Sequence, residues 1–398
     1  MSNVSERGIV MPASPIRKLI PFANKAKERG IRIIPLNIGQ PDIPTPKPIM
    51  DAMKRFDAEV LAYSPSNGEE SLLKAFSQYY QRININLKPE NIIVTTSGSE
   101  AIYFAMLAVC DVGDELLVFE PFYTNYYGIG VEAGVKLKAV RTYPETGFHL
   151  PAKEEIEKAI TSKTKGILIC NPNNPTGTVY SDKELEVLRE LVKEHNIFLI
   201  SDEVYREFVY DGQTHTSIMT LEGVADNLIL IDSVSKRYSV CGARIGLIAS
   251  YNKKIMDAVL KFAQARLSSP TIEQVGAQAG IEMDLSYFKP ILEEYEKRRN
   301  AVLDGLHKIP GVVCETPGGA FYCIAKLPID NAEKFAKWMM TDFSHEGESV
   351  LVAPAEGFYT TPGLGVDEVR ISYVLEVPKL KRAMELLGIA IERYNSQA

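Results

Sequence analysis

The chain has 398 residues, 45% hydrophobic and 24% charged, which is long enough for two globular domains with substantial cores. Its formal net charge is -7, and no run of lysines or arginines is longer than three residues. We therefore expect neither nucleic acid nor a membrane surface as a partner.

The chain shows no targeting, spanning or metal-binding pattern. Its first residues, MSNVSERGIVMPASPIRKL, lack a long apolar run, and no window approaches eighteen uninterrupted apolar residues. The five cysteines are scattered and mostly adjoin apolar residues, so we interpret them as buried thiols and expect a cytoplasmic protein. The five histidines show no metal-ligand spacing, and we expect no metal.

Short runs rich in Ile, Leu and Val predict buried strands in the first two thirds of the chain. These runs span residues 91–96, 115–120, 166–170, 198–202, 227–232 and 245–250. Their continuous apolarity is typical of strands covered on both faces. Amphipathic stretches such as 181–196, which begins with Ser-Asp, separate several of them. The alternation predicts an α/β fold with a mostly parallel sheet flanked by helices.

The pattern changes after about residue 285. A long charged helix is predicted at 288–309, two short strands within 311–328, and further strands at 348–354 and 368–374. We therefore predict three segments. Residues 1–45 form an N-terminal segment and part of a small domain, 46–285 a large ligand-binding domain, and 286–398 the rest of a smaller α+β domain built from the two chain ends.

Four polar stretches each follow a predicted strand. They are TSGSEA (96–101), NPNNPTG (171–177), SDEVY (201–205) and SVSK (233–236). Any one alone is explained equally well as a helix cap, a turn or a surface lysine. Ligands of open α/β sheets bind beyond the carboxyl ends of the strands, so four such stretches in one chain predict a ligand site there.

The residue types in these stretches indicate a phosphate site. Gly98 and Ser99 open a predicted helix with free backbone N–H groups, which attract anions. Ser233 and Ser235 add hydroxyl donors, and Arg244 adds a planar fork suited to phosphate.

Two further residues indicate covalent chemistry beside this phosphate site. Asp202 ends a core strand, where a carboxylate is costly unless it pairs with a cation. Lys236 ends another strand, and a lysine whose pKa is lowered there forms Schiff bases. A phosphate anchor, a buried carboxylate and such a lysine match the needs of pyridoxal 5'-phosphate.

At this point the chain clearly resembles the class I/II aminotransferases, the aspartate aminotransferase-like family of pyridoxal-phosphate fold type I. The resemblance covers nearly the whole chain. Besides the four stretches above and CGARIG (241–246), the matching motifs in family order are LNIGQPD (36–42), AYSPSNG (62–68), EPFYTNY (120–126), PGGAFY (317–322) and VRISYV (369–374).

The resemblance implies a role for each matching position. Lys236 would hold the cofactor covalently and move the substrate's Cα proton, and Asp202 would pair with the pyridinium nitrogen. Tyr205 and Asn174 would bind the cofactor's phenolic oxygen, and Tyr123 would stack on its ring. The phosphate would bind Gly98, Ser99, Ser233, Ser235 and Arg244, and Glu100 completes the expected cofactor-binding set. Arg370, with Asn174 and the backbone at Gly39, would bind the substrate's α-carboxylate. Tyr63 would reach the site of a neighbouring subunit, which implies a homodimer, and Asn174–Pro175 would be a cis bond.

The predicted activity is amino-group transfer between an L-amino acid and a 2-oxo acid by a ping-pong mechanism, of the aspartate/glutamate type. Alternatives are alanine or aromatic amino acids as substrates, or a carbon–sulfur lyase reaction on the same fold. An acidic substrate needs a second cation, for which Arg17 and Arg266 are the candidates. Some aspartate-specific relatives carry a lysine where this chain has Ser99. This departure argues against strict specificity for aspartate.

Readings from other classes have weaker support. GIGVEAG (128–134) has the wrong spacing for a dinucleotide fingerprint and follows no predicted strand. No G-x-S-x-G nucleophile elbow occurs. A regulatory protein with an aminotransferase-like domain would carry a basic DNA-binding segment, and the motifs begin near residue 36, which leaves no room for one.

Overall fold

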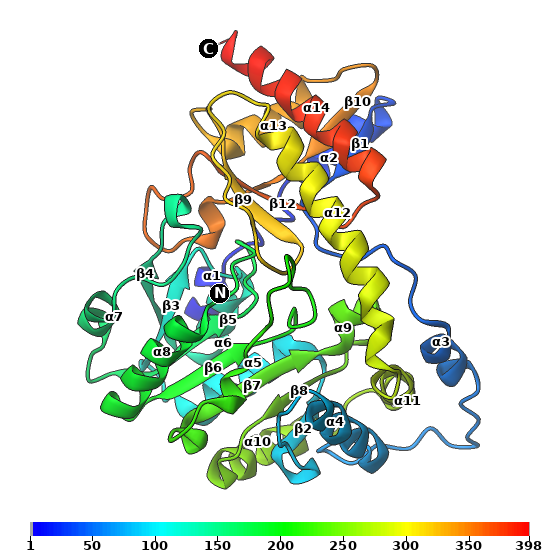
Figure 1. Cartoon of the computed structure of the whole chain (residues 1–398), viewed down its shortest axis with the longest axis vertical. Coiled ribbons are helices and arrows are strands. Elements are labelled where there is room, and N and C mark those ends of the chain that lie inside the picture. Colours follow the sequence, from blue (N-terminus) through cyan, green and yellow to red (C-terminus); the bar gives the residue numbers. More distant parts are fainter. Residues whose placement is uncertain (1–2, 398) are drawn as a thin grey trace.

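The structure, a computed structural model, describes residues 3–397, and its centre is a seven-stranded sheet (Figure 1). The strand order is β2 (Ile92–Thr95), β8 (Gly246–Ala249), β7 (Leu228–Ser233), β6 (Phe198–Asp202), β5 (Thr164–Cys170), β3 (Glu115–Glu120) and β4 (Lys136–Arg141). Neighbouring strands are parallel except for β8, which runs antiparallel to both β2 and β7. The predicted mostly parallel sheet is confirmed, and only its edge strand β4 was missed.

Both faces of the sheet are buried, as the continuous apolar runs predicted. In β7, Ile229 and Ile231 belong to one hydrophobic core, whereas Leu228 and Leu230 belong to a second core on the opposite face. Helix α5 (Ser97–Val109) packs on the first face, against β7 and β8. Helix α8 (Asp182–His195) contributes to the second core.

Helix α8 forms where its sequence predicted. The Ser181 side chain accepts a hydrogen bond from the Glu184 N–H, and the Glu184 carboxylate accepts one from the Ser181 N–H, which is a complete capping box. The apolar residues at helical spacing, Leu185, Leu188, Leu191 and Val192, are all fully buried. The cap and the apolar face together fix the helix against the sheet.

The segment of residues 20–35 meets the C-terminal part of the chain in the upper part of the molecule, whereas α1 (Glu6–Val10) lies lower, beside the large sheet (Figure 1). Strand β1 (Arg32–Pro35) pairs in parallel with β10 (Glu348–Leu351). A separate three-stranded antiparallel sheet has the order β11 (Ala353–Pro354), β12 (Glu368–Ser372) and β9 (Tyr322–Lys326). The first of the two strands predicted in 311–328 is reduced to a single bridge between Val313 and Lys326.

Long helices complete the upper part. Helix α12 (Phe288–Leu306) packs against α14 (Val377–Asn395) and runs down the side of the molecule toward the large sheet (Figure 1). The division of the chain at residues 45 and 285 stays a prediction. The remaining helices are α1 (Glu6–Val10), α2 (Ile20–Glu28), α3 (Lys47–Lys54), α4 (Glu70–Arg82), α6 (Asn125–Ala133), α7 (Lys153–Ala159), α9 (Val234–Arg237), α10 (Lys253–Arg266), α11 (Thr271–Ile281) and α13 (Ala332–Thr341).

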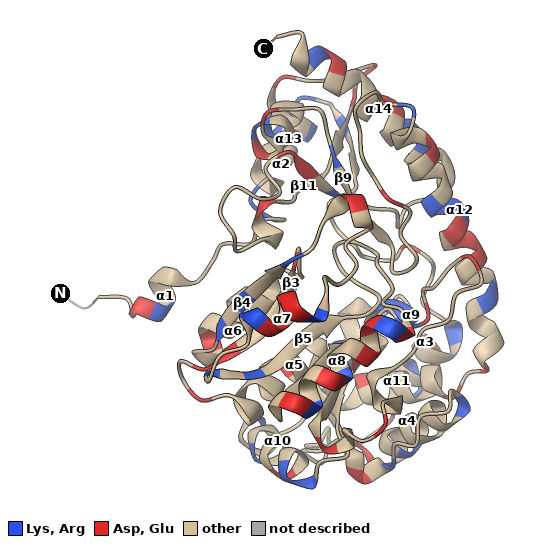
Figure 2. Cartoon of the chain, turned by 60° about the vertical axis from the view of Figure 1, so that its left-hand side comes forward, with Lys and Arg blue, Asp and Glu red and all other residues tan. Residues whose placement is uncertain are grey.

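The charges are spread over the outer helices with both signs mixed, for example along α8, α12 and α14 (Figure 2). Within residues 3–397, no helix combines the length and apolarity needed to span a bilayer.

Candidate active site

A cavity of about 380 Å³ opens beyond the carboxyl ends of strands β5, β6 and β7. It brings together predicted residues from distant parts of the sequence: Gly39, Gly98, Ser99, Tyr123, Asn174, Asp202, Tyr205, Ser233, Ser235, Lys236, Arg244 and Arg370. The ends of five strands (β2, β3, β5, β6 and β7), the segment before α3 and strand β12 therefore converge on one site.

One wall of the cavity carries hydrogen-bond donors suited to an anion. Helix α5 begins at Ser97, so the backbone N–H groups of its first turn lie at this wall. The hydroxyls of Ser233 and Ser235 are 2.7 Å apart, and Arg244 donates a hydrogen bond to the Ser97 hydroxyl. A guanidinium, helix N–H groups and hydroxyls at one place match a phosphate ester.

The backbone at this wall is held in an unusual conformation. Ser97 and Arg244 both have positive φ angles, 72° and 57°. A side chain on Gly246 would collide with the backbone of Ser97, at 2.5 Å, and of Gly98, at 2.7 Å. Glycine at 246 therefore allows strand β8 to approach the start of α5 and brings Arg244 to the wall. Such conformations cost energy and are frequent at ligand sites.

Asp202 is a buried carboxylate at the floor of the cavity. It accepts a hydrogen bond from the Tyr126 hydroxyl at 2.8 Å and a longer one from the Val204 N–H at 3.4 Å. Burial raises the pKa of Asp202 to about 6, against the lowering effects of Tyr126, Val204 and Lys236. A cationic N–H in the cavity would relieve this burial by pairing with the carboxylate.

Lys236 extends from the short helix α9 into the same cavity. Its Nζ donates to the backbone carbonyl of Gly39 at 3.0 Å and lies 3.9 Å from the Cys241 Sγ. No side-chain carboxylate forms an ion pair with it among the described residues, so its amine is not held by a salt bridge.

Arg370 on strand β12 is the deepest cation of the cavity and is 2% exposed. Its guanidinium donates to the Asn174 Oδ1 at 3.0 Å and to the Asn37 carbonyl at 2.6 Å. The Tyr322 ring lies 4.5 Å from the guanidinium carbon, and the Arg370 Nε has no hydrogen-bond partner within residues 3–397. Burial lowers the pKa of Arg370 from its usual value, and an anionic ligand would compensate that cost.

The two candidate arginines for a distal carboxylate have different surroundings. Arg17 lines the cavity together with Ser14 and Ile16, and its guanidinium forms no ion pair or hydrogen bond with the described residues. Arg266 does not line the cavity. Its Nε pairs with the Glu100 carboxylate at 3.2 Å, and its Nη2 donates to the Val94 carbonyl at 3.0 Å.

Two sequence-based expectations, on Glu100 and on a cis bond, meet a different arrangement, whereas the role of Tyr63 at a neighbouring subunit stays a prediction. Glu100 does not line the cavity, because its carboxylate accepts the Thr96 N–H and pairs with Arg266 instead. Tyr63 is 81% exposed and lies outside the cavity of its own chain. The expected cis bond at Asn174–Pro175 was wrong: the cis bonds of the described chain are Glu120–Pro121 and Asn171–Pro172.

The structure adds residues that the motifs did not single out. Tyr126 holds Asp202, and Tyr322 connects the Tyr205 hydroxyl, at 3.1 Å, with the Gly39 carbonyl, at 3.5 Å. A side chain on Gly39 would overlap the Tyr322 hydroxyl, which explains glycine at this position. Both tyrosines lie in motifs quoted above, EPFYTNY and PGGAFY, but their partners come from other segments and are visible only in the fold.

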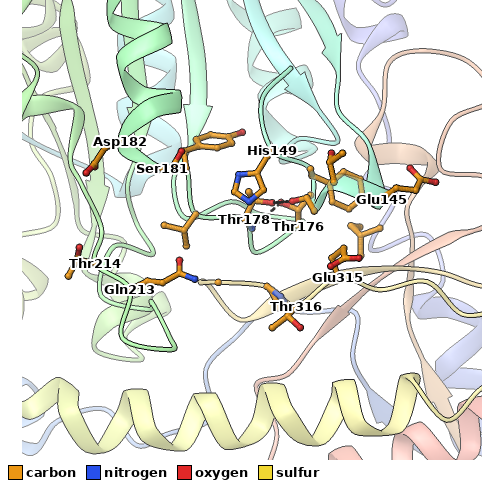
Figure 3. Close-up of a pocket in the computed structure, with 18 residues that line it drawn as sticks. Glu145, His149, Thr176, Thr178, Ser181, Asp182, Gln213, Thr214, Glu315 and Thr316 are labelled. Atoms are coloured by element: carbon orange, nitrogen blue, oxygen red, sulfur yellow. Dashed lines mark hydrogen bonds between the residues drawn. The ribbon is translucent and has the colours of Figure 1, made fainter. Parts of the chain in front are cut away.

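A second, larger hollow of about 710 Å³ lies elsewhere and is lined by residues such as His149, Thr178, Gln213 and Glu315 (Figure 3). It contains none of the predicted site residues. Its buried Thr176 and Thr178 hydroxyls already bond each other at 2.7 Å, so they offer no unpaired polar group to a ligand. The smaller cavity is therefore the candidate active site.

Comparison with known proteins agrees with this geometry. Residues 31–387 match the family described as "Aminotransferase class I and II". The aspartate aminotransferase of Bacillus subtilis is 33% identical over 384 residues, covering 94% of this chain and 95% of that protein. Aromatic-amino-acid aminotransferase 2 of Thermococcus litoralis is 32% identical and covers 96% of both. The structure of an alanine aminotransferase from Pyrococcus furiosus superposes with a TM-score of 0.89 at 29% identity, covering 98% of this chain and 100% of that one.

Proposed function

The chain belongs to the class I and II aminotransferase family, and from this premise we propose that its cavity uses pyridoxal 5'-phosphate to move an amino group between a dicarboxylic L-amino acid and a 2-oxo acid. The observation that carries the substrate class is the pair of cavity cations not assigned to the cofactor, the buried Arg370 and the unpaired Arg17. The aminotransferase activity itself follows from the family and from relatives that cover nearly the whole chain.

The residues around the cavity fit this cofactor. We assign its phosphate to the wall formed by the start of α5, Ser233, Ser235 and Arg244, and its ring nitrogen to the buried carboxylate of Asp202. Tyr123 is assigned to the ring face, and Tyr205 and Asn174 to the phenolic oxygen. When bound, pyridoxal phosphate supplies an electron sink for the electron pair left behind when the substrate's Cα–H bond breaks.

Lys236 is the residue that we propose to attach the cofactor and to carry the proton. Its Nζ is 3.0 Å from the Gly39 carbonyl, which holds the amine among the residues that line the cavity. Once released from the cofactor, the amine is free to accept the proton from the substrate's Cα and to return it in the next step.

Arg370 is proposed to bind the α-carboxylate. Asn174 and Asn37 orient the guanidinium, and its Nε remains available to a carboxylate oxygen. The Tyr322 ring on one face and the Phe358 ring, 5.1 Å away, prevent the guanidinium from moving aside. This fixes where the Cα–H bond of the substrate lies relative to Lys236.

The names of the relatives differ in substrate, so they do not choose it: aspartate, aromatic and alanine aminotransferases all match at about 30% identity. Arg17 favours a distal carboxylate, because an unpaired guanidinium at the cavity is a poor neighbour for an apolar side chain. Arg266 is already neutralised by Glu100, and it is not assigned to the substrate.

We also propose a homodimer in which Tyr63 reaches the partner's cavity. Tyr63 adjoins Val60 and Leu61, which are 75% and 61% exposed, and α1 adds the exposed Ile9. Exposed apolar side chains favour burial in a subunit interface. Light scattering during gel filtration tests this proposal, and a monomer at micromolar concentration would contradict it.

The function is tested by a half-reaction. Purified protein is loaded with pyridoxal 5'-phosphate, and its visible absorbance is followed while single amino acids are added. Aspartate or glutamate should remove the visible band fastest, and a 2-oxo acid should restore it. The Lys236→Ala variant serves as the negative control. A band that no amino acid changes would contradict the aminotransferase reaction, and release of ammonia, pyruvate and hydrogen sulfide from cysteine would identify a lyase.

Substrate class is tested by Arg17→Met with Arg266→Met as the matched control. Arg17→Met should raise the KM for aspartate or glutamate roughly tenfold, the change that about 1.4 kcal/mol produces, and leave alanine unaffected. Arg266→Met should not change the ratio between the two substrate types. Faster reaction with alanine or phenylalanine, together with an unaltered Arg17→Met variant, would establish the alternative substrate class.

A further inference from the structure

Directly behind the candidate active site lies a buried ionic cluster that the proposed reaction does not use. It consists of Glu203, Arg206, Glu207, Asp232 and Arg237, and we call it the strand-end cluster. The side chains of Glu203 and Arg237 are 0% exposed, and those of Arg206 and Asp232 are 3% and 1% exposed. Five charged side chains buried together behind a reaction site need an explanation.

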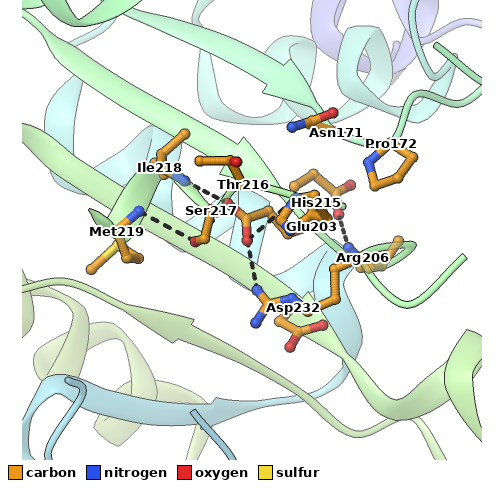
Figure 4. Close-up of polar contacts among 12 residues, drawn as sticks. Asn171, Pro172, Glu203, Arg206, His215, Thr216, Ser217, Ile218, Met219 and Asp232 are labelled. Atoms are coloured by element: carbon orange, nitrogen blue, oxygen red, sulfur yellow. Dashed lines mark hydrogen bonds and ion pairs between the residues drawn. The ribbon is translucent and has the colours of Figure 1, made fainter. Parts of the chain in front are cut away.

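The cluster is connected in two halves. In the first, Glu203 accepts hydrogen bonds from Arg206 at 2.7 Å and from Ser217 and the Ile218 N–H at 3.0 Å each (Figure 4). His215 lies beside it, with its Nε2 3.8 Å from the Glu203 carboxylate, and burial lowers the pKa of His215 to about 3, so the ring is neutral at neutral pH.

The second half is centred on Arg237. Its Nη2 donates to the Asp232 Oδ2 at 2.6 Å, and its Nε lies 3.4 Å from the Glu207 carboxylate. The Tyr80 hydroxyl also donates to the Asp232 Oδ2, at 2.6 Å, and the Tyr79 ring lies 4.9 Å from the Arg237 guanidinium carbon. Arg206 links the halves, because its guanidinium packs on the Tyr80 ring at 4.9 Å.

Each half of the cluster adjoins the reactive residues in sequence. Glu203 follows Asp202 and Arg206 follows Tyr205. Asp232 precedes Ser233 and Arg237 follows Lys236.

The two sets of side chains lie on opposite faces of the sheet. In β7, Ser233 continues the face of Ile229 and Ile231, on which α5 packs, whereas Asp232 continues the face of Leu228 and Leu230. That second face carries Tyr79 and Tyr80 of α4. The same strand ends therefore present reactive groups to the cavity and charged groups to the far side.

Stability alone does not account for the cluster. Burying charges costs about as much as their pairing returns, and apolar residues of similar size are often as stable. The pairing here is also incomplete: within residues 3–397, Nη1 of Arg206 and Nη1 of Arg237 have no hydrogen-bond acceptor. A cluster that contributes little net stability still fixes geometry strongly, because each forked guanidinium is held by more than one partner.

We propose that the strand-end cluster positions the reactive side chains: it anchors the backbone next to Asp202 and Lys236 from the far side of the sheet, and so fixes the directions in which both project into the cavity. The inference rests on the proposed function for its kinetic consequence. Its members are positioning residues, since none of them lines the cavity.

The decisive variant is Arg237→Lys, which keeps the charge and removes the fork that joins Asp232, through Nη2, to Glu207, through Nε. In the cofactor-loaded full-length protein, kcat should fall roughly tenfold to hundredfold, the usual effect of a small misplacement of reacting groups, while the KM for the amino acid should change less than about twofold. The pH midpoint of the visible absorbance, which reports on the attached Lys236, should shift by roughly half a pH unit or more. Tyr80→Phe removes one donor to Asp232 and should give smaller changes in the same direction.

Arg299→Lys is the matched control. Arg299 is also a buried forked arginine, 3% exposed, and it does not line the cavity. Its two terminal nitrogens donate to the Asp211 carboxylate at 2.6 and 2.8 Å. Its variant should lose thermal stability but keep kcat and the absorbance midpoint. If Arg237→Lys and Arg299→Lys lose activity only in proportion to their loss of stability, the cluster is merely structural and the proposal fails. If Arg237→Lys does not fold, Tyr80→Phe decides, and wild-type kcat and midpoint in that variant overturn the proposal.

A readout on the cofactor-free protein separates this proposal from the proposed function. The Lys236 amine is labelled with acetic anhydride and the modification rate is read by mass spectrometry. Loss of its contact with the Gly39 carbonyl frees the amine and should raise the rate in Arg237→Lys roughly threefold. An unchanged rate contradicts positioning by the cluster, whether or not the loaded protein transfers amino groups.

Discussion

Replacing Asp202 by asparagine is expected to stabilise the cofactor-free protein while it removes the transamination activity. Asp202 is 5% exposed, and no cation is paired with it among the described residues. Its hydrogen bonds from Tyr126 and Val204 do not compensate for burial, because the pKa of Asp202 is raised to about 6 from the ordinary 3.8. Without a bound cofactor, the charged form of this carboxylate therefore opposes folding.

The size of the effect follows from the pKa. A difference of about two units corresponds to about 3 kcal/mol. Since the pKa of the folded state lies above that of the unfolded state, the penalty is fully present above about pH 6 and disappears as the pH falls below 3.8. At pH 5 about half of it should remain.

Urea unfolding of the cofactor-free wild type and the Asp202→Asn variant at pH 5.0, 6.5 and 8.0 measures this difference. The variant should be more stable at pH 8.0, by about 3 kcal/mol, and its advantage should shrink as the pH falls. Asp226→Asn, at an exposed aspartate in the segment before β7, is the control and should show no such trend. A variant that is less stable than the wild type at pH 8.0, or whose advantage does not depend on pH, would refute the reasoning about burial.

Three further outcomes are expected. Tyr126→Phe removes the 2.8 Å hydrogen bond that lowers the pKa of Asp202, so the acid limb of the pH–activity profile should move up by about one pH unit. Tyr127→Phe, at a neighbouring residue that is 42% exposed, is the control and should leave the profile unchanged. The Glu120 carboxylate accepts hydrogen bonds from the N–H groups of residues 360 and 361, at 3.0 and 3.2 Å. Glu120→Gln weakens this acceptor and should lower the free energy of unfolding in urea by about 1–3 kcal/mol. An unchanged free energy would show that this contact contributes nothing to stability. Ser181→Ala removes the capping box of α8 and should cost about 1 kcal/mol in the same assay without changing kcat, so a loss of kcat would contradict a purely structural role.

The large sheet was predictable because its strands are buried on both faces. The runs at 115–120 and 198–202 correspond to β3 and β6 residue for residue. Strand β4 escaped because it is an edge strand: its sequence, KLKAVR, alternates lysines with apolar residues, and both lysine and arginine ends are exposed. The strand expected early in 311–328 failed because only Val313 of that stretch bridges Lys326.

The candidate site was predictable where a residue lies at or just beyond the end of its own strand, as Asp202 and Lys236 do. It was not predictable where a residue acts through a distant partner. Tyr126 reaches Asp202 across 76 positions, and Tyr80 reaches Asp232 across 152. No local pattern encodes such a contact, because helical or strand periodicity reports only which face is buried and not what lies against it.

Glu100 shows how one contact can change the interpretation of a whole pocket. Its place in TSGSEA made Glu100 a candidate for binding the cofactor. The need of an acidic substrate for a second cation made Arg266 a candidate for binding the substrate. The structure pairs the two at 3.2 Å and takes both away from the cavity. Apart from Arg244, which is assigned to the phosphate, the cavity is then left with two guanidiniums, Arg370 held deep by two asparagines and Arg17 unpaired among the described residues. A substrate with two carboxylates can neutralise both, whereas a substrate with one carboxylate leaves Arg17 facing its side chain, and this difference is the physical basis on which the proposed substrate class rests.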